Sequence, residues 1–173
     1  MKALDLKQSI RDVPDFPKKG IIFKDITTLL NDPKRFKQAV DAMASLYKGK
    51  GIDNVVCIEA RGFIFGSVLA YKLGAGLVIV RKKGKLPSKT YEVSYDLEYG
   101  QDTLAIHQDS LKKNSNVLIV DDVLATGGTI AAVCRLLKKC KAKVSGICFL
   151  IELDFLNGRK KLKGYKVDSL INY

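Results

Sequence analysis

Two neighbouring carboxylates stand just before a turn of small residues, within the segment Asp121–Thr129. Gly127 and Gly128 let the backbone bend tightly and bring its N–H groups close to a ligand. A helix that begins at such a turn adds unpaired N–H donors and a partial positive charge, which favour a phosphate. The acid pair would repel that phosphate, so we expect Asp121 and Asp122 to face sugar hydroxyls and Mg²⁺. The alternative interpretation is an ordinary capped helix after an acidic turn.

Two further polar segments are candidates for binding an anion. Glu59–Gly62 and Arg81–Lys85 each come directly after a short apolar run. The tight cluster of cations at Arg81–Lys85 suits an anionic ligand. The alternatives are a surface ion pair between Arg61 and Glu59, and a solvated run of charges.

The apolar runs that precede these segments must position them. Three continuously apolar runs predict strands buried on both faces of a parallel sheet, at Val55–Ile58, Leu77–Val80 and Val117–Val120. A fourth strand is predicted at Val144–Leu153 and a short tail strand at Val167–Ile171.

Predicted helices alternate with these strands. Asp32 and Pro33 favour a helix start, and apolar residues follow them at helical spacing as far as Tyr47. A second helix is predicted from about Phe63 to Leu73, and a third begins near Thr129. The alternation indicates an α/β fold with a central, mostly parallel twisted sheet flanked by helices. Ligands of such sheets bind at the carboxyl ends of the strands.

A polar, glycine-containing stretch from Lys82 leads into an alternating run, Tyr91–Leu97, which predicts a hairpin strand with one wet face. Leu104 and Ile106 are candidates for its partner strand. A flexible catalytic loop over about 82–100 would close over the reactants and exclude water.

The segment from Val117 to Thr129 resembles the phosphoribosyl pyrophosphate signature of the type I phosphoribosyltransferases. Further segments keep the order and approximate spacing found in the adenine phosphoribosyltransferases, and the resemblance covers the chain from about Asp15 to Tyr173. These segments are Asp15–Pro17, Gly20–Ile26, Glu59–Phe63, Gly84–Pro87 and Leu97–Gly100. The resemblance implies one domain over 1–173, with a small N-terminal hood over 1–30 and a core over 31–173.

The resemblance also implies a reaction in purine salvage. It is the magnesium-dependent transfer of the 5-phosphoribosyl group from phosphoribosyl pyrophosphate to N9 of adenine, giving AMP and pyrophosphate. The Mg²⁺ would be held mainly by the substrate, with Asp121 and Asp122 nearby. The family further implies a homodimer with the Arg61 region near its interface, and no nucleic-acid partner.

By the same resemblance each site residue has an expected role. The 5-phosphate would lie against Ala125, Thr126, Gly127, Gly128 and Thr129, and the ribose hydroxyls against Asp121 and Asp122. Pyrophosphate would meet Arg61, Arg81, Lys82, Lys85 and Tyr99. Adenine would meet Ile22, Phe23, Lys24 and Val123. A strained or cis peptide is expected near Ala60–Arg61.

Glu98 is the expected catalytic residue. Attack by N9 of adenine on the anomeric carbon releases a proton, which a glutamate at the foot of the loop would accept. A solvent-facing glutamate in a hairpin has the same spacing, so the spacing alone does not separate the two. Lys24 stands where the family commonly has arginine, and Val123 replaces the more usual leucine, so purine selectivity is less determined than the reaction.

Composition sets the broad class. The 173 residues are 47% hydrophobic and 28% charged, which is ordinary for a globular protein. No apolar run reaches the roughly 18 residues that a membrane helix needs, and no secretion signal is visible, so we expect a cytoplasmic protein. The four cysteines form no CxxC pair, and we expect buried, reduced thiols. His107 is expected to be structural.

Two other functions match part of the pattern. The first is transfer to hypoxanthine, guanine or xanthine, against which the Ile22–Asp25 and Leu97–Gly100 segments argue. The second is a regulator that senses phosphoribosyl pyrophosphate and binds RNA or DNA, which the net charge of +12 leaves open. A sensor has no need of Glu98 as a proton acceptor.

Overall fold

The computed structural model describes residues 6–96 and 100–173. Its centre is a seven-stranded sheet with the strand order β5-β6-β4-β3-β7-β8-β9. Five of these strands run parallel to one another: β3 (Asn54–Ile58), β4 (Gly76–Lys82), β7 (Asn116–Leu124), β8 (Lys143–Glu152) and β9 (Val167–Asn172). The predicted α/β fold with a mostly parallel sheet is therefore confirmed.

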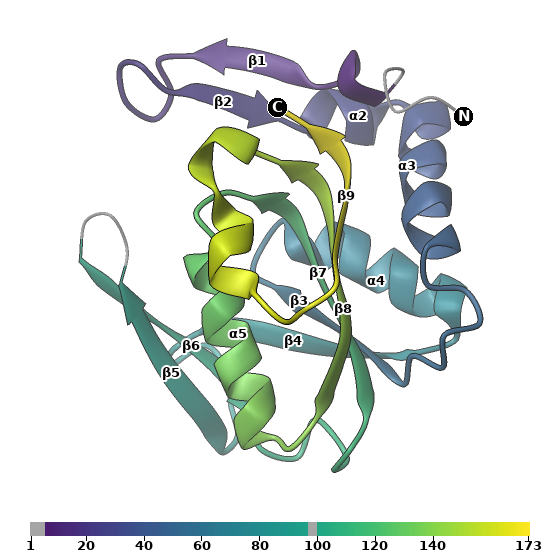
Figure 1. The fold of residues 1–173 in the computed structure, drawn as a ribbon, viewed down its shortest axis with the longest axis vertical. Coiled ribbons are helices and arrows are strands. Elements are labelled where there is room, and N and C mark those ends of the chain that lie inside the picture. Colours follow the sequence, from purple (N-terminus) through teal and green to yellow (C-terminus); the bar gives the residue numbers. More distant parts are fainter. Residues whose placement is uncertain (1–5, 97–99) are drawn as a thin grey trace.

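An antiparallel ribbon extends one edge of the sheet. It consists of β5 (Thr90–Asp96) and β6 (Gln101–His107), and β6 pairs antiparallel with the end of β4. Figure 1 shows this ribbon projecting away from the body of the sheet. The hairpin predicted after Lys89 is confirmed, and Leu97 lies outside the described residues.

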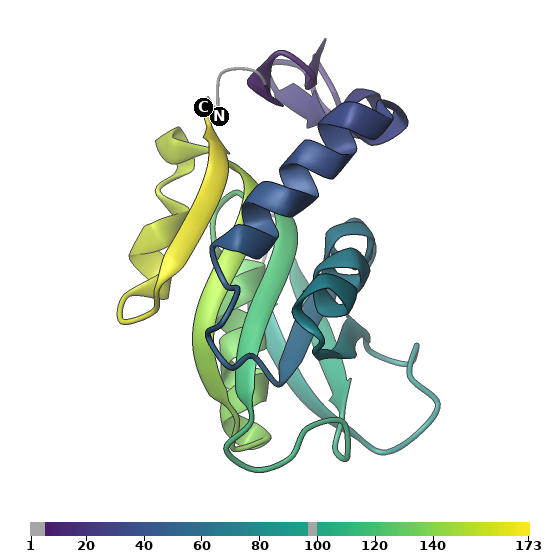
Figure 2. The ribbon, with the colours of Figure 1, turned by 90° about the vertical axis from the view of Figure 1, so that its right-hand side faces the viewer.

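Helices cover both faces of the sheet. On one face lie α3 (Pro33–Ser45) and α4 (Gly62–Leu73), and on the other lie α5 (Gly128–Lys139) and two short 3₁₀ helices, η1 (Asp154–Leu156) and η2 (Gly158–Leu162). Figure 2 shows α3 and α4 on the side of the sheet opposite η1 and η2. The predicted cap of α3 is present, because Oδ1 of Asp32 accepts hydrogen bonds from the backbone N–H groups of Lys34 and Arg35.

Each helical layer closes a separate hydrophobic core. Phe65 and Leu69 of α4 pack with Leu118 of β7 on one face, and Leu136 of α5 packs with Phe149 of β8 on the other. These side chains are fully buried, so the sheet is held between two apolar layers.

The expectation that Leu77–Val80 is buried on both faces is wrong. Val78 and Val80 are buried in the core beneath α5, but Leu77 is 45% exposed and Ile79 is 36% exposed. The reason is that α4 lies mainly over β3 and β7 and contacts β4 less extensively, so part of this face of β4 stays open to solvent.

A small hairpin stands apart from the sheet. Its strands are β1 (Arg11–Pro14) and β2 (Ile22–Asp25), followed by the short helix α2 (Thr27–Asn31). Figure 1 places this hairpin over the carboxyl ends of β7, β8 and β9. The carboxylate of Asp25 accepts from the backbone and hydroxyl of Thr27 and pairs with Arg11, and these contacts lower the pKa of Asp25 to about 2.

The cysteines and the histidine have structural surroundings, as expected. Cys57, Cys134, Cys140 and Cys148 are all free and buried. The imidazole Nε2 of His107 accepts a 3.4 Å hydrogen bond from the backbone N–H of Ser88. Among the helices of the described residues, none has the length and apolar character to cross a bilayer.

Candidate active site

Two cavities meet at the carboxyl ends of β3, β4 and β7. The larger has a volume of about 450 Å³ and the smaller about 80 Å³. They share four lining residues, Asp121, Val123, Ala125 and Thr129. A ligand that fills both would extend from the helix start of α5 towards the ends of β3 and β4.

The smaller cavity lies at the bend from Ala125 to Thr129. Its wall includes Thr126, Gly127 and Thr129, and α5 begins directly behind it at Gly128. No side-chain hydrogen bond caps this helix start, so its first-turn N–H groups face the bend without a side-chain partner. Such a site favours a bound oxyanion.

Gly127 is required for the shape of this bend. Its φ of 75° lies in the left-handed region, and a Cβ atom at this position would stand 2.4 Å from the carbonyl oxygen of Gly158. Gly158 in turn lies so close to Ala125 that a Cβ on it would stand 2.2 Å from the Ala125 oxygen. Gly158 was missed in the sequence, where the only signal was the turn-forming pair Asn157–Gly158.

The acid pair ends the strand that leads into the bend. Asp122 is only 4% exposed, whereas Asp121 is half-buried and lines both cavities. The backbone N–H of Asp122 donates a 2.9 Å hydrogen bond to Oδ1 of Asp121. Burial, and then the charge of Asp122, raise the pKa of Asp121 well above its usual range.

Arg61 pairs with this acid pair and not with Glu59. Its Nε atom lies 2.8 Å from Oδ2 of Asp122, so the alternative pairing of Arg61 with Glu59 is wrong. The N–H is not aligned for a hydrogen bond, and Oδ2 therefore has a counter-charge but no hydrogen-bond donor. Burial raises the pKa of Asp122, while the positive charge of Arg61 acts to lower it.

The residue after Arg61 must be small. A Cβ atom at Gly62 would stand 2.8 Å from Oδ1 of Asp121, so the start of α4 approaches the acid pair closely only because Gly62 has no side chain. A cis peptide joins Glu59 and Ala60, one bond before the Ala60–Arg61 position named from the sequence.

The predicted pyrophosphate cations are already paired with carboxylates. Arg81 donates to both oxygens of Glu59, at 3.0 and 3.2 Å, and Nζ of Lys85 donates to the same carboxylate at 2.9 Å. These hydrogen bonds lower the pKa of Glu59 to about 2. Nζ of Lys82 lies 2.9 Å from the carboxylate of Asp102 on β6.

The four residues expected at adenine are only partly brought together. Val123 lines both cavities, whereas the described lining residues do not include Ile22, Phe23 or Lys24 of the hood. Phe23 is connected to the site through Arg61, whose guanidinium carbon lies 5.1 Å from the ring centroid. Ile22 is 56% exposed.

Lys24 is held by its neighbours on the hood side. Its Nζ is 2.7 Å from Oδ1 of Asp12 and 3.8 Å from the centroid of the Tyr173 ring. Two expected site residues, Glu98 and Tyr99, lie outside the described residues.

The larger cavity carries more negative than positive groups. Its described wall contains the carboxylates of Glu59, Asp102, Asp121 and Asp122, and two cations, Arg61 and Lys82. Within residues 6–96 and 100–173, no three His, Cys, Asp or Glu side chains are grouped closely enough to hold a metal ion. Phosphate and hydroxyl oxygens of a substrate are suitable ligands for Mg²⁺.

Comparisons with known proteins agree with this geometry. Residues 25–172 match the model of the phosphoribosyl transferase domain family. A curated protein of Geobacter metallireducens named adenine phosphoribosyltransferase is 59% identical over 169 residues, which is 98% of this chain and 99% of the relative.

Solved structures show the same fold. The adenine phosphoribosyltransferase of Thermoanaerobacter pseudethanolicus has a TM-score of 0.96 and 50% identity, covering 99% of this chain and 100% of that one. The enzyme of Saccharomyces cerevisiae, solved with an imino-altritol bisphosphate and adenine, has a TM-score of 0.92 and 40% identity, covering 97% of each chain.

Proposed function

The chain belongs to the adenine phosphoribosyltransferase family, and we infer that it performs this family's reaction in purine salvage. The reaction transfers the 5-phosphoribosyl group from phosphoribosyl pyrophosphate to N9 of adenine and gives AMP and pyrophosphate. The observation that carries this conclusion is the junction of two cavities, one at an uncapped helix start and the other beside a pair of carboxylates. A sugar phosphate needs these two environments side by side.

The smaller cavity is proposed to hold the 5-phosphate. Backbone N–H groups of Ala125–Thr129, together with the hydroxyls of Thr126 and Thr129, would donate to its oxygens. The volume of about 80 Å³ suits a single phosphate group and not a whole nucleotide. The acid pair at the entrance would then accept hydrogen bonds from the ribose hydroxyls.

Mg²⁺ is proposed to enter with the substrate, held mainly by substrate oxygens with Asp121 and Asp122 nearby. When bound, the ion would supply positive charge that offsets the negative pyrophosphate. The excess of carboxylates in the larger cavity supports this proposal, because without such an ion the wall would repel a polyphosphate.

The roles of the remaining residues are proposed from the family resemblance. Arg61, Arg81, Lys82, Lys85 and Tyr99 are proposed to bind pyrophosphate, and Glu98 to accept the N9 proton. Lys82 and Arg61 line the larger cavity, which supports their part in this assignment.

Adenine is proposed to bind between the hood and Val123. Ile22, Phe23 and Lys24 of the hood would contact the base, and backbone groups of β2 would form hydrogen bonds with its edge. The contact between Arg61 and Phe23 supports this arrangement, because it links the hood to the site where the ribose would lie.

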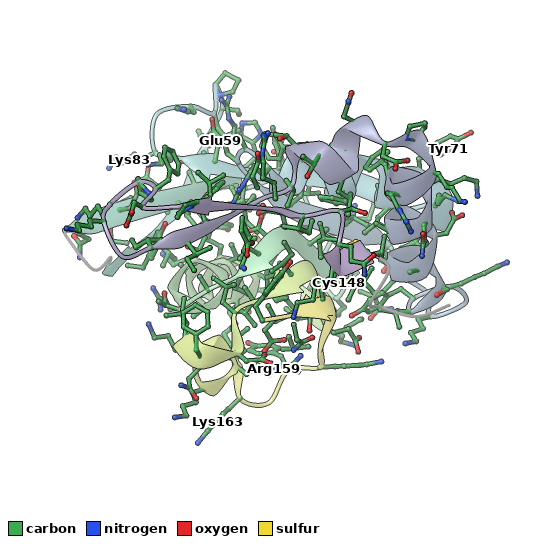
Figure 3. The ribbon with its side chains drawn as sticks, turned by 90° about the horizontal axis from the view of Figure 1, so that it is seen from above. Glu59, Tyr71, Lys83, Cys148, Arg159 and Lys163 are labelled. Carbon is green, nitrogen blue, oxygen red and sulfur yellow. The ribbon has the colours of Figure 1, made fainter. Side chains whose placement is uncertain are left out.

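A homodimer is proposed on the apolar surface left by α4 and β4. Tyr71 of α4 is 88% exposed, and Leu77 and Ile79 of β4 are also exposed. Figure 3 shows Tyr71 at the outer edge of the molecule. Neighbouring exposed apolar side chains of this size are typical of protein contacts. Sedimentation of the wild type and of Leu77→Lys tests the proposal, and equal monomer masses would contradict it.

A cytoplasmic location is also proposed. The four cysteines are free and buried, which suits a reducing compartment.

The reaction is tested by pyrophosphate release from phosphoribosyl pyrophosphate and Mg²⁺ with each purine in turn. We expect release with adenine and formation of AMP. Release only with hypoxanthine, guanine or xanthine would contradict the assignment, and so would salt-dependent binding to nucleic acid without any turnover.

A further inference from the structure

We propose that Glu59 is a positioning residue that holds Arg81 and Lys85 in the absence of pyrophosphate, and that pyrophosphate binding displaces its carboxylate from them. The inference rests on the proposed function of Arg81 and Lys85 as pyrophosphate-binding cations. It adds a residue with the opposite charge, which competes with the ligand for the same donors.

The contacts of Glu59 are those that a phosphate group would make. Its two oxygens accept from Nε and Nη2 of Arg81, at 3.2 and 3.0 Å, in a bidentate arrangement. Nζ of Lys85 adds a third donor at 2.9 Å. Arginine forks bind carboxylate and phosphate with the same geometry, so one anion can replace the other.

Glu59 is the member of this cluster that lines the cavity. It lines the larger cavity, whereas the described lining residues include neither Arg81 nor Lys85. Figure 3 shows Glu59 on the same side of the molecule as Lys83. A pyrophosphate in this cavity therefore lies beside the carboxylate that holds the two cations.

The side chain of Glu59 is only 16% exposed, and it remains charged at any working pH because its partners lower its pKa to about 2. Nη1 of Arg81 also donates to the backbone oxygen of Lys85, at 3.0 Å, which ties the loop to the same network. The network thus keeps both cations in place between turnovers. The same network weakens the binding of pyrophosphate, which helps this product to leave.

The test measures magnesium pyrophosphate binding by calorimetry for the wild type and for Glu59→Gln. Glu59→Gln removes the carboxylate charge and keeps the shape of the side chain. Pyrophosphate should then bind about tenfold more tightly, because it no longer competes with a charged acceptor for Arg81 and Lys85. Steady-state kinetics should show stronger product inhibition by pyrophosphate and a lower kcat, with the KM for adenine unchanged.

The matched control is Asp41→Asn. Asp41 pairs with two cations, Lys37 and Lys72, on the surface of α3 and α4, so this variant removes the same charge and frees the same number of cations elsewhere. Its pyrophosphate affinity should equal that of the wild type. An equal gain in both variants would show a general charge effect and overturn the inference.

Two further variants separate the possible failures. If Lys85→Met binds pyrophosphate like the wild type, the cations are not the binding site and the proposed function of this cluster fails. If Lys85→Met binds more weakly but Glu59→Gln shows unchanged or weaker binding, Glu59 has only a structural role and the inference alone fails. Glu59→Asp moves the carboxylate away from the two cations by one methylene, so it should also tighten pyrophosphate binding. This variant replaces Glu59→Gln in the test if Glu59→Gln does not fold.

Discussion

The Nε atom of Arg61 lies 2.8 Å from Oδ2 of Asp122, so a residue expected to meet pyrophosphate pairs with one expected to meet the ribose. The same guanidinium packs over Phe23 of the hood. One side chain, itself proposed to bind pyrophosphate, thus contacts a residue proposed for the ribose and one proposed for adenine. The positions of the Asp122 carboxylate and of the Phe23 ring therefore both depend on the Arg61 guanidinium.

Arg61→Met removes the charge of this side chain and keeps much of its apolar volume, so it tests the contribution of the charge alone. Asp122 would remain buried without a counter-charge, and we expect a loss of about 1–2 kcal/mol in the free energy of unfolding. Turnover should fall by about tenfold to a hundredfold. Urea unfolding and initial rates measure the two effects, and Arg61→Lys should recover part of both. Wild-type stability together with wild-type rates in Arg61→Met would contradict the role of the ion pair.

Asp121→Asn should change stability and binding in opposite directions. The pKa of Asp121 is raised in the folded protein, so the folded state binds more protons than the unfolded state above about pH 4. The wild type therefore loses stability as pH rises through this range, and the asparagine variant does not. We expect the variant to gain on the order of 1 kcal/mol at pH 8 relative to pH 4.

The same Asp121→Asn variant should bind phosphoribosyl pyrophosphate about tenfold or more weakly, because a charged acceptor for sugar hydroxyls and Mg²⁺ is lost. Urea titrations at the two pH values and the KM for phosphoribosyl pyrophosphate measure these effects. A variant that is less stable at pH 8 and unchanged in KM would contradict both expectations.

Gly127→Ala should damage the phosphate bend specifically. The new Cβ would clash with the Gly158 oxygen in a left-handed conformation, so we expect a loss of about 1–3 kcal/mol and a raised KM for phosphoribosyl pyrophosphate. Gly74→Ala is the control, because Gly74 has a φ of 65° but open space where its Cβ would lie. It should lose about 1 kcal/mol with unchanged kinetics. Similar KM values in the two variants would show that the bend does not bind the substrate.

Glu98→Gln should lower kcat by about 10²- to 10⁴-fold while substrate binding is mostly kept, as expected for the loss of a general base. Single-turnover rates and calorimetric binding separate the two quantities. Glu92→Gln is the matched control, since Glu92 is a glutamate of β5 that pairs with Lys83. Wild-type turnover in Glu98→Gln would remove Glu98 from the mechanism.

The cysteines should resist alkylation in the folded protein. Burial raises the pKa of Cys57 and Cys148 to about 12 and that of Cys134 to about 11, so almost no thiolate is present at pH 8.5. Mass spectrometry after iodoacetamide treatment should show no labelling of these three in the native protein. All four cysteines should be labelled in urea, and rapid native labelling of Cys57 or Cys148 would contradict their burial.

Local sequence patterns were sufficient for the inner strands, for the three longest helices and for the bend after the acid pair. Continuous apolar runs gave the inner strands, and the Asp32–Pro33 pair gave the start of α3, because capping and strand burial depend on residues close in the chain. The bend after Asp122 was recognised for the same reason, since its glycines and helix start are adjacent in sequence.

Contacts between distant segments were beyond the sequence. Arg61 reaches Asp122 rather than Glu59, Glu59 pairs with Arg81 and Lys85, and Gly158 supports the phosphate bend. Each of these contacts joins loops that only the parallel sheet brings together. Electrostatic attraction and close packing act between residues that are near in space, so the position of a residue in the chain does not show which partner it will contact.

The sequence by itself determined which residue types stand at the strand ends and in what order. The tertiary structure decided which charges are paired and which apolar faces remain open, as for Leu77 and Ile79. The physical reason is that propensity and capping are properties of neighbouring residues, whereas ion pairing and burial depend on the distances that the folded sheet imposes.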